Sequence, residues 1–510
     1  MDRLLNEYYG LLLDNKRFVL LYIVALFVFI IPMLSPRNID FPNFEIFSFV
    51  CIAILGSFLI LFSVKNKNSL HKVAFAVIMF IGVLMTFIAP PFSIPDEYIH
   101  FARVLHVAGG NLFVMDSSKS SVFINGFHYK LLYYIFDLYK FHVRGIGSLL
   151  LNNPRAWAPI SSVPENYVLR VTTTPFYTYV FSAIGVLLAK ILDLGVIWAV
   201  WLSRIFNVVF YAAIVSFAIK KTPVYKMQLF FVSLTPLIIP ILSSSNYDAF
   251  IFAFIILATA YFIYMYKNKV GSKDLLMFFI CCLLIGLIKP PFIIFALIIL
   301  LLPKKNLSYK HPWVMLAAYL LLLFAVSAII FKGNVMFTQT PSAVSTKPTV
   351  SIVGQTMFLI NNPLRILEIF GEAFEGLYNF IVNGYYFYEY RTSAFKGLQL
   401  YNICYFVFFI LFSIYYPTRI QLSKHKKEAL IIFFILFYFG MFFLIYLIWC
   451  SVGIGKVRGM QARYFLPLMP LVPLAFNSPK PETDKMDNLV FTGIILFAAG
   501  VLMMCILHFY

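Results

Sequence analysis

The feature that most restricts the fold of this 510-residue chain is the recurrence of long apolar runs from Phe18 to the C-terminus. A helix that crosses a bilayer needs about 20 apolar residues, or slightly fewer when flanking side chains reach the interface. No charged stretch between the runs is long enough for a separate soluble domain. We therefore predict an all-α polytopic membrane protein, one integral domain over residues 1–510. The runs predict about thirteen transmembrane helices, at residues 18–34, 44–63, 72–90, 196–218, 227–243, 249–266, 275–288, 290–302, 312–331, 400–416, 428–449, 464–478 and 488–508.

Composition excludes a soluble protein, because 62% of the residues are hydrophobic and only 12% are charged, whereas soluble domains are about a quarter charged. The net charge of +19 does not indicate nucleic acid, because Lys and Arg lie in short clusters between the apolar runs. The six cysteines lack paired spacing in polar loops, which predicts neither a disulfide framework nor a metal knuckle. The bias toward Phe, Ile, Lys, Tyr and Asn is typical of an AT-rich bacterial genome, so we expect a bacterial plasma membrane.

The basic clusters predict the topology, since Lys and Arg accumulate in cytoplasmic loops. With the N-terminus in the cytoplasm and the C-terminus outside, the clusters share one side if two conditions hold. Residues 174–192 must not cross the membrane, and residues 275–302 must form a hairpin that turns at Lys289-Pro290-Pro291. The clusters are Arg3/Lys16/Arg17, Lys65/Lys67/Lys72, Lys220/Lys221/Lys226, Lys267/Lys269/Lys273, Lys304/Lys305/Lys310, Arg419/Lys424/Lys426/Lys427 and Lys480/Lys485.

Two long segments, residues 92–195 and 332–399, are too polar and irregular to span the membrane. Loops of such length are more often functional than idle. We expect both to be extracytoplasmic, to carry short juxtamembrane helices and to cover one cavity. Within the first, the aromatic segment from Thr174 to residue 192 predicts an amphipathic helix on the membrane surface.

Adjacent carboxylates, Asp96 and Glu97, follow the third predicted span, with His100 close behind. Charges at the membrane boundary are costly unless they are used. One of the carboxylates could act as a general base, or both could join Asp248 in holding Mg²⁺ or Mn²⁺. The structural alternative is a helix start, where acidic residues favour the helix dipole. His100 could serve as an acid, a base or a hydrogen-bonded structural residue.

Polar residues inside predicted spans extend this set. Arg204 and Asn207 lie in the fourth span, where an arginine usually faces a cavity or a partner. Arg204 could hold a phosphate or pair with Asp96 or Glu97. Arg103 follows His100 at helical spacing, which predicts a shared face with Asp96 and His100.

Asp248 and Lys289 lie at two predicted outer turns. Asp248 ends the sequence Asn246-Tyr247-Asp248, in which Asn and Asp are also ordinary turn residues. Lys289 stands at the apex of the hairpin and could bind phosphate or pair with a carboxylate.

The short outer loop 451–463 contradicts the topology rule, because it carries Lys456, Arg458 and Arg463. Such an exception predicts an anionic ligand, for example a lipid phosphate or diphosphate. The alternatives are anionic lipid headgroups and a salt bridge to residues 332–399.

These residues together resemble a family of uncharacterised multipass bacterial membrane proteins grouped with the GT-C glycosyltransferases. The resemblance covers about residues 90–470, and its most specific parts are the first and the last block. It rests on Pro95-Asp96-Glu97-Tyr98-Ile99-His100, Thr174-Pro175-Phe176-Tyr177, Arg204 with Asn207, Asn246-Tyr247-Asp248, Lys289-Pro290 and Gln461-Ala462-Arg463-Tyr464-Phe465-Leu466-Pro467.

The resemblance implies a GT-C-like fold with an extracytoplasmic active site that uses a polyprenyl-phosphate-linked sugar. Asp96 or Glu97 would be the catalytic base. Three predicted spans precede that loop, where the simplest GT-C layout has one. The residues expected to bind substrate or phosphate are His100, Arg103, Arg204, Asp248, Lys289, Arg458, Gln461, Arg463 and Tyr464.

The leading functional hypothesis is therefore an inverting sugar transferase in the membrane, with or without help from a divalent cation. Its acceptor would be a hydroxyl group of a cell-wall or surface glycan. A flippase for lipid-linked saccharides would need the basic groups without a base. A noncatalytic subunit of a wall-polymer assembly complex would need neither.

Overall fold

The fold is taken from a computed structural model. It describes residues 2–31, 42–94, 96–113, 121–125, 151–162, 166–170, 172, 174–307, 312–337, 350–382, 398–477 and 484–510. Pro95 and much of the two long predicted loops lie outside these residues.

The described chain is almost entirely helical, as the apolar runs predict. Long helices are α1 (Asp2–Ile30), α2 (Pro42–Lys65), α3 (Leu70–Ile88), α9 (Val196–Lys221), α12 (Asp248–Lys267), α13 (Ser272–Ile288), α14 (Pro312–Phe337), α17 (Leu398–Tyr415), α18 (Lys424–Trp449) and α20 (Asp484–Phe509). Shorter elements in the same bundle are α10 (Lys226–Ser233), α11 (Ile238–Leu242), α19 (Val472–Phe476) and the 3₁₀ helices η2 (Lys67–Ser69), η5 (Pro290–Leu301), η6 (Lys304–Asn306) and η9 (Ala462–Leu471).

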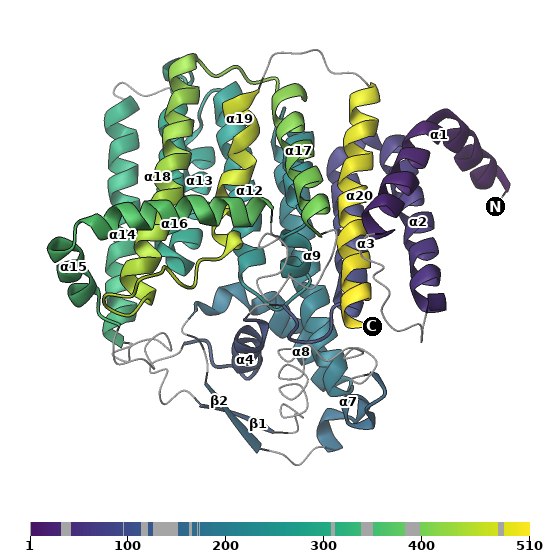
Figure 1. Cartoon of the computed structure of the whole chain (residues 1–510), viewed down its shortest axis with the longest axis horizontal. Coiled ribbons are helices and arrows are strands. Elements are labelled where there is room, and N and C mark those ends of the chain that lie inside the picture. Colours follow the sequence, from purple (N-terminus) through teal and green to yellow (C-terminus); the bar gives the residue numbers. More distant parts are fainter. Residues whose placement is uncertain are drawn as a thin grey trace.

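The all-α polytopic class is confirmed. Within the described residues, six helical segments are long and apolar enough to cross a membrane: 45–65, 67–88, 196–221, 248–267, 424–449 and 485–509. The other seven predicted spans also fall on helical segments, and whether each of them crosses the bilayer stays a prediction. Figure 1 shows the long helices running side by side.

Two predicted spans are interrupted, which the apolar pattern did not predict. Span 227–243 is divided into α10 and α11, with Pro236 in the gap. Span 464–478 begins as the 3₁₀ helix η9, which contains Pro467 and Pro470, and continues as α19. Proline supplies no N–H group and clashes with the preceding turn, so a continuous α-helix does not form at these positions.

The turn at Lys289 is confirmed, because α13 ends at Ile288, η5 begins at Pro290 and the two helices pack against each other. Residues 174–192 do not form one long helix. They form a 3₁₀ turn, η4 (Phe176–Thr178), and the helix α8 (Val180–Ile191), which packs on α9.

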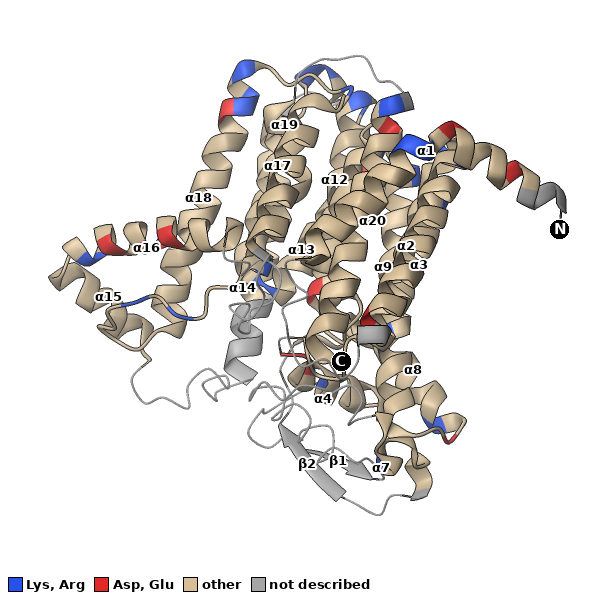
Figure 2. Cartoon of the chain, turned by 45° about the vertical axis from the view of Figure 1, so that its right-hand side comes forward, with Lys and Arg blue, Asp and Glu red and all other residues tan. Residues whose placement is uncertain are grey.

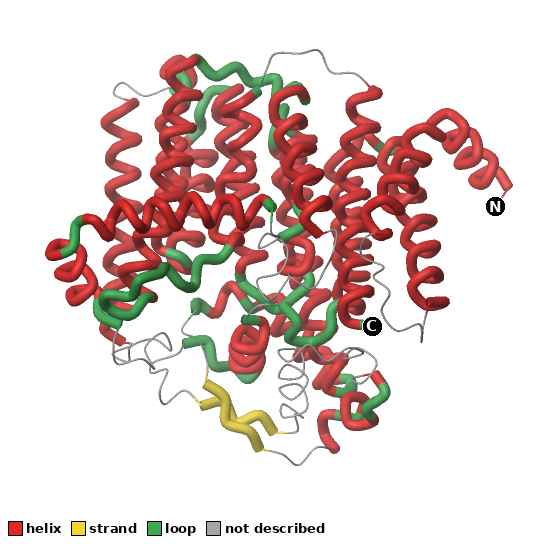
Figure 3. Tube along the Cα trace, viewed as in Figure 1, coloured by secondary structure: helices red, strands yellow, loops and turns green. Residues whose placement is uncertain are grey.

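Short elements gather beyond one end of the bundle (Figure 1). They are α4 (Glu97–Ala108), α7 (Pro154–Trp157), the 3₁₀ turn η3 (Ile160–Ser162), α8, and the antiparallel strands β1 (Ser121–Asn125) and β2 (Asn166–Arg170). Ser121 pairs with Arg170 and Asn125 with Asn166. The sequence analysis missed this strand pair, which Figure 3 shows in yellow. We call this end of the bundle the α4 end.

The second long segment contributes α15 (Ile352–Asn361) and α16 (Leu364–Ile381). These are the short helices that the sequence analysis predicts there. Figure 1 shows α16 crossing the long helices at a steep angle, and it packs against α17 and α18.

Basic residues collect at the opposite end of the bundle (Figure 2), which we call the basic end. Two cavities at this end are lined by residues from different predicted clusters, namely Lys67, Lys226, Lys267, Lys305, Arg419 and Lys426. The helix α12 runs from Asp248 to Lys267, a length of about 30 Å. That length matches the hydrocarbon core of a bilayer, which is about 30 Å thick.

The close packing of α8 on α9 gives the first prediction. A methyl group on Gly185 would lie 2.4 Å from the backbone of Leu202, whereas one on Gly440 in α18 would meet nothing within 4 Å. We expect Gly185→Ala to destabilise the protein by about 1–3 kcal/mol through overpacking. Gly440→Ala should be neutral or slightly stabilising, because alanine favours helix. Thermal unfolding in detergent measures both, and equal midpoints would contradict the packing.

Candidate functional site

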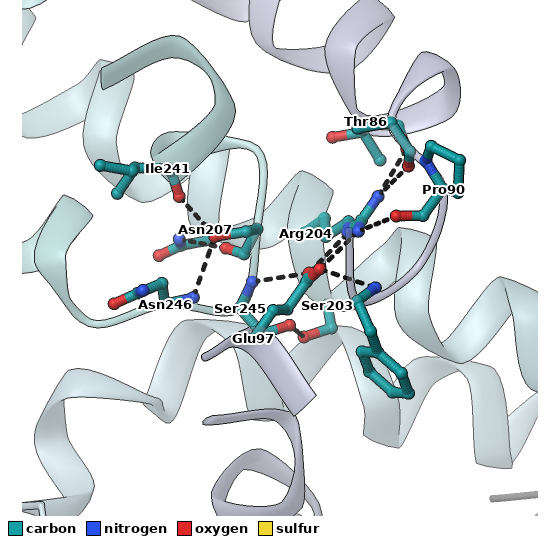
Figure 4. Close-up of polar contacts among 12 residues, drawn as sticks. Thr86, Pro90, Glu97, Ser203, Arg204, Asn207, Ile241, Ser245 and Asn246 are labelled. Carbon is teal, nitrogen blue, oxygen red and sulfur yellow. Dashed lines mark hydrogen bonds and ion pairs between the residues drawn. The ribbon is translucent and has the colours of Figure 1, made fainter. Parts of the chain in front are cut away.

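A buried ion pair between Glu97 and Arg204 organises the α4 end (Figure 4). The Arg204 guanidinium donates from Nε to Glu97 Oε1 at 2.7 Å and from one terminal nitrogen to Oε2 at 2.6 Å. Both side chains are fully buried. Of the two sequence-based interpretations of Arg204, the structure contains the pairing with a carboxylate.

Arg204 uses its remaining N–H groups to hold the end of α3. It donates to the backbone carbonyls of Thr86 at 3.1 Å, Ala89 at 2.5 Å and Pro90 at 3.0 Å. A guanidinium has five N–H donors, and these contacts together with the Glu97 bonds engage all of them. Arg204 is therefore satisfied without a ligand.

Glu97 also accepts hydrogen bonds from two backbone amides. Phe92 N lies 2.9 Å from Oε2, and Ser245 N lies 3.2 Å from Oε1. Glu97 thus joins the loop after α3 to the turn before α12. That turn is also held on α9, where Ser203 contacts Ser245 at 2.9 Å (Figure 4).

Asn207, one turn farther along α9, completes this support by donating to Ser244 O at 2.7 Å. The supported turn leads directly into Asp248, the first residue of α12. On the other side of the ion pair, Asp96 precedes α4 in a left-handed conformation with φ of 61°, which Asp tolerates better than most residues. The buried pair therefore fixes the starting points of both acidic residues.

Asp96 and Asp248 meet on one guanidinium. Arg463 donates from a terminal nitrogen to Asp96 Oδ2, and its Nε lies 3.2 Å from Asp248 Oδ2. Gln461 Oε1 accepts a further hydrogen bond from Arg463 Nε at 2.8 Å. Lys289 Nζ lies 2.5 Å from the other Asp248 oxygen. Four residues far apart in sequence thus form an alternating chain of two carboxylates and two cations.

Aromatic rings surround the lysine of this chain. Lys289 Nζ lies 4.6 Å from the ring centre of Tyr464, 5.1 Å from that of Tyr247 and 5.6 Å from that of Phe292. Ring faces attract cations, so these contacts hold the ammonium group in place. Tyr464 was predicted as a site residue; the other two rings were not.

His100 lies beside the same cluster. Its Nδ1 is 2.8 Å from the Tyr179 hydroxyl, and its ring packs edge to face on Tyr247 at 4.6 Å. Burial lowers the pKa of His100 to about 4, an effect that outweighs the attraction of Asp96. The imidazole is therefore neutral near pH 7. Tyr179 was missed from sequence, although the Thr174-Pro175-Phe176-Tyr177 motif stands just before it.

The three carboxylate side chains of the site differ in their exposure to solvent. The Asp96 side chain is 33% exposed, whereas Asp248 is 5% and Glu97 is 0% exposed. Burial alone would raise the pKa of Asp96, but Arg463 and other neighbouring positive charge hold that pKa below its usual range. Asp96 is thus an ionised carboxylate that solvent reaches.

Two predicted ligand-binding residues lie elsewhere. Arg103 donates to the carbonyls of Thr174, Asn111 and Leu112 and contacts His106 Nδ1. These bonds connect α4 with the residues that directly follow it and with Thr174, just before η4. The expected common face of Asp96, His100 and Arg103 therefore does not bring Arg103 into the cluster.

Arg458 is exposed, and its backbone pairs with Cys450. Its neighbour Lys456 lies 3.5 Å from Glu375 of α16, while Val457 N donates to Glu372 at 2.6 Å. The predicted alternative of a salt bridge to the second long segment therefore holds for Lys456.

The predicted metal ligands are not gathered into one donor set. Glu97 is engaged by Arg204, and Asp96 and Asp248 are separated by the Arg463 guanidinium. Within the described part of the chain, no group of three or more His, Cys, Asp or Glu side chains is arranged to hold a metal ion.

Comparison with known proteins identifies the family. A family model described as "Predicted membrane protein (DUF2142)" matches residues 79–472, a range that includes every residue of the site. No curated protein matches the chain, and no solved structure does.

The buried ion pair yields a stability prediction. Glu97→Gln keeps the shape but leaves Arg204 as an uncompensated buried charge, which should cost about 3–5 kcal/mol. Asp96→Asn removes a partly exposed partner and should cost less than about 1 kcal/mol. Thermal unfolding in detergent should show a much lower midpoint for the first variant. Similar midpoints for the two would contradict the structural role of Glu97.

His100 should make stability pH-dependent. Its pKa is about 4 in the folded chain, against 6.5 as the ordinary value. Between these values the unfolded state binds the proton and the folded state does not, so stability falls as pH falls. The loss from pH 7 to pH 5 should be about 2 kcal/mol.

His100→Gln should reduce that loss, measured as the difference between unfolding midpoints at pH 7 and pH 5. His106, whose pKa is also lowered to about 4 by burial, leaves part of the pH dependence in the variant. An identical midpoint shift in the variant and the natural protein would refute the assignment to His100.

Proposed function

The chain belongs to the DUF2142 family of predicted membrane proteins, and from that premise we propose that it is a sugar transferase of GT-C type. The donor is a sugar linked to polyprenyl phosphate. The acceptor is a hydroxyl group of a cell-wall or surface glycan. The protein lies in the bacterial plasma membrane, with the basic end and the N-terminus in the cytoplasm, because Lys and Arg are retained on that side. The α4 end and the C-terminus face outward.

One observation carries the proposal: Asp96, a partly exposed carboxylate with a lowered pKa, lies on the same guanidinium as a buried carboxylate–lysine pair. Asp96 can accept a proton, whereas Lys289 and Arg463 can bind a phosphate. A glycosyl transfer from a lipid phosphate needs both functions within reach of one bond. The resemblance to GT-C enzymes, in which a carboxylate of the first large outer loop is the base, supports the same assignment.

In this mechanism the donor phosphate binds Arg463 and Lys289, which weakens the hold of Arg463 on Asp96. The acceptor hydroxyl then attacks the anomeric carbon as Asp96 takes its proton. The bond between the anomeric carbon and the phosphate oxygen breaks, and the lipid phosphate leaves as an anion held by the two cations. Attack opposite the leaving group inverts the anomeric configuration.

Asp96, rather than Glu97, is the base in this proposal. All contacts of Glu97 serve Arg204 and two backbone amides, and a buried bidentate pair gives up its geometry only at high cost. His100, Tyr179 and Gln461 position the cluster. Lys289 and Arg463 supply the positive charge that neutralises the phosphate. The alternative is that Mg²⁺ or Mn²⁺ supplies part of this charge.

The variant Asp96→Asn distinguishes the proposed transferase from a flippase and from a noncatalytic subunit. Asp96→Asn should lower sugar transfer by about 10²–10⁴-fold, because general-base catalysis is lost, while donor binding is retained. The assay uses purified protein in nanodiscs, a panel of labelled polyprenyl-phosphate sugars and a glycan extract as acceptor.

Asp274→Asn is the matched control, since Asp274 is also a partly buried carboxylate in an ion pair, with Lys221, away from the site. It should transfer sugar at the natural rate. Unchanged transfer by Asp96→Asn would remove Asp96 from the mechanism. Translocation without transfer by the natural protein would favour the flippase.

A further inference from the structure

A polar cavity lies at the basic end, away from the candidate site. Its volume is about 710 Å³, within the range of about 300–1,000 Å³ typical of small-ligand sites. Three connections between helices meet around it, together with the first turn of α18. Its lining is Tyr266, Lys267, Pro303, Lys305, Asn306, Pro417, Thr418, Arg419, Ile420, Gln421, Lys426 and Asn477.

The charge of this lining has one sign. Four of the described lining residues are Lys or Arg, and none of those described is Asp or Glu. Cations that surround a concave space raise the local concentration of anions there. The cavity is therefore suited to a ligand that carries several negative charges.

Two buried polar side chains, Thr418 and Asn477, are part of this lining. Thr418 Oγ1 donates to the Ile420 carbonyl at 3.0 Å and contacts Asn477 Oδ1 at 2.9 Å. Asn477 Nδ2 donates to Tyr416 O at 2.8 Å, and Gln228 Nε2 donates to Pro417 O at 2.9 Å. These bonds fix the segment before and after Arg419.

The same segment holds Arg419 in a backbone conformation that arginine seldom adopts, with φ of 54°. Such strain persists only when the surrounding structure imposes it, and it is frequent at ligand sites. Lys426 is also held in place, because its Nζ donates to Leu301 O at 2.7 Å and lies 5.3 Å from the ring centre of Tyr266. These contacts restrict the cations before a ligand binds, so less conformational entropy is lost on binding.

We propose that this cavity, at the end opposite the candidate site, binds a diphosphate or a phosphomonoester, each of which carries more than one negative charge. The ligand is either a soluble phosphorylated molecule or the headgroup of a phosphorylated lipid. Lysines on a flat surface would be enough to keep this end of the protein on the cytoplasmic side. Four cations around a concave space, together with the hydrogen-bonded side chains of Thr418 and Asn477, go beyond that requirement. The inference does not depend on the proposed sugar transfer.

The test is a calorimetric titration of the purified full-length protein in neutral detergent with inorganic pyrophosphate at low ionic strength. Lys267→Gln combined with Lys305→Gln removes two lining cations. The matched control combines Lys269→Gln with Lys304→Gln, which removes two exposed neighbours outside the lining. We expect the first variant to bind pyrophosphate about tenfold more weakly per cation removed, because each charge-assisted contact contributes roughly that factor.

The control variant should bind like the natural protein. Equal weakening in both variants would show attraction by overall charge and overturn the proposal, as would no binding by the natural protein. Unfolding midpoints establish that both variants fold. A second titration, in nanodiscs of phosphatidylcholine with or without phosphatidic acid, separates the sources. If phosphatidic acid competes with pyrophosphate, the site binds a lipid headgroup. If phosphatidic acid does not compete, the site binds a soluble ligand.

Discussion

The arrangement of the α4 end depends on the buried pair of Glu97 and Arg204. An ion pair without access to water is stable only when every donor and acceptor is used, and here the guanidinium engages three backbone carbonyls besides Glu97. The pair thereby joins α9 to the end of α3, the start of α4 and the turn before α12. A residue that looks catalytic in the sequence is thus the one that sets where its neighbour, Asp96, can lie.

The chain of Asp96, Arg463, Asp248 and Lys289 follows from that constraint. Two carboxylates and two cations balance one another, and the neutral His100 adds no charge. A balanced cluster can lie at a membrane boundary at lower cost than separate charges. In the proposed mechanism, the donor phosphate competes directly with the carboxylates for the same cations. Of the two carboxylates in this cluster, Asp96 is more exposed than Asp248, so the proposed competition releases Asp96 more readily.

The helices and most charged residues of the site could be predicted from the sequence. Which charged residues pair with one another could not. Apolar runs and basic clusters depend on local composition, so the spans and the turn at Lys289 could be predicted. The breaks near Pro236 and Pro467 were missed because mean apolarity is insensitive to single prolines. Partners are set by tertiary packing. Adjacent Asp96 and Glu97 have different partners, Arg463 and Arg204, and no single-sequence pattern contains the left-handed conformation at position 96.

Basic residues therefore differ at the two ends of the bundle according to their partners. At the α4 end, Lys289 and Arg463 are already bound to carboxylates, so an anion must displace a protein group and supply equivalent hydrogen-bond acceptors. Under the proposed function, this requirement couples phosphate binding to the release of Asp96. At the basic end, the cavity is lined by Lys267, Lys305 and Arg419, and none of its described lining residues is Asp or Glu. Anion binding proposed for that cavity should weaken as salt is added, because Lys267, Lys305 and Arg419 are exposed to solvent.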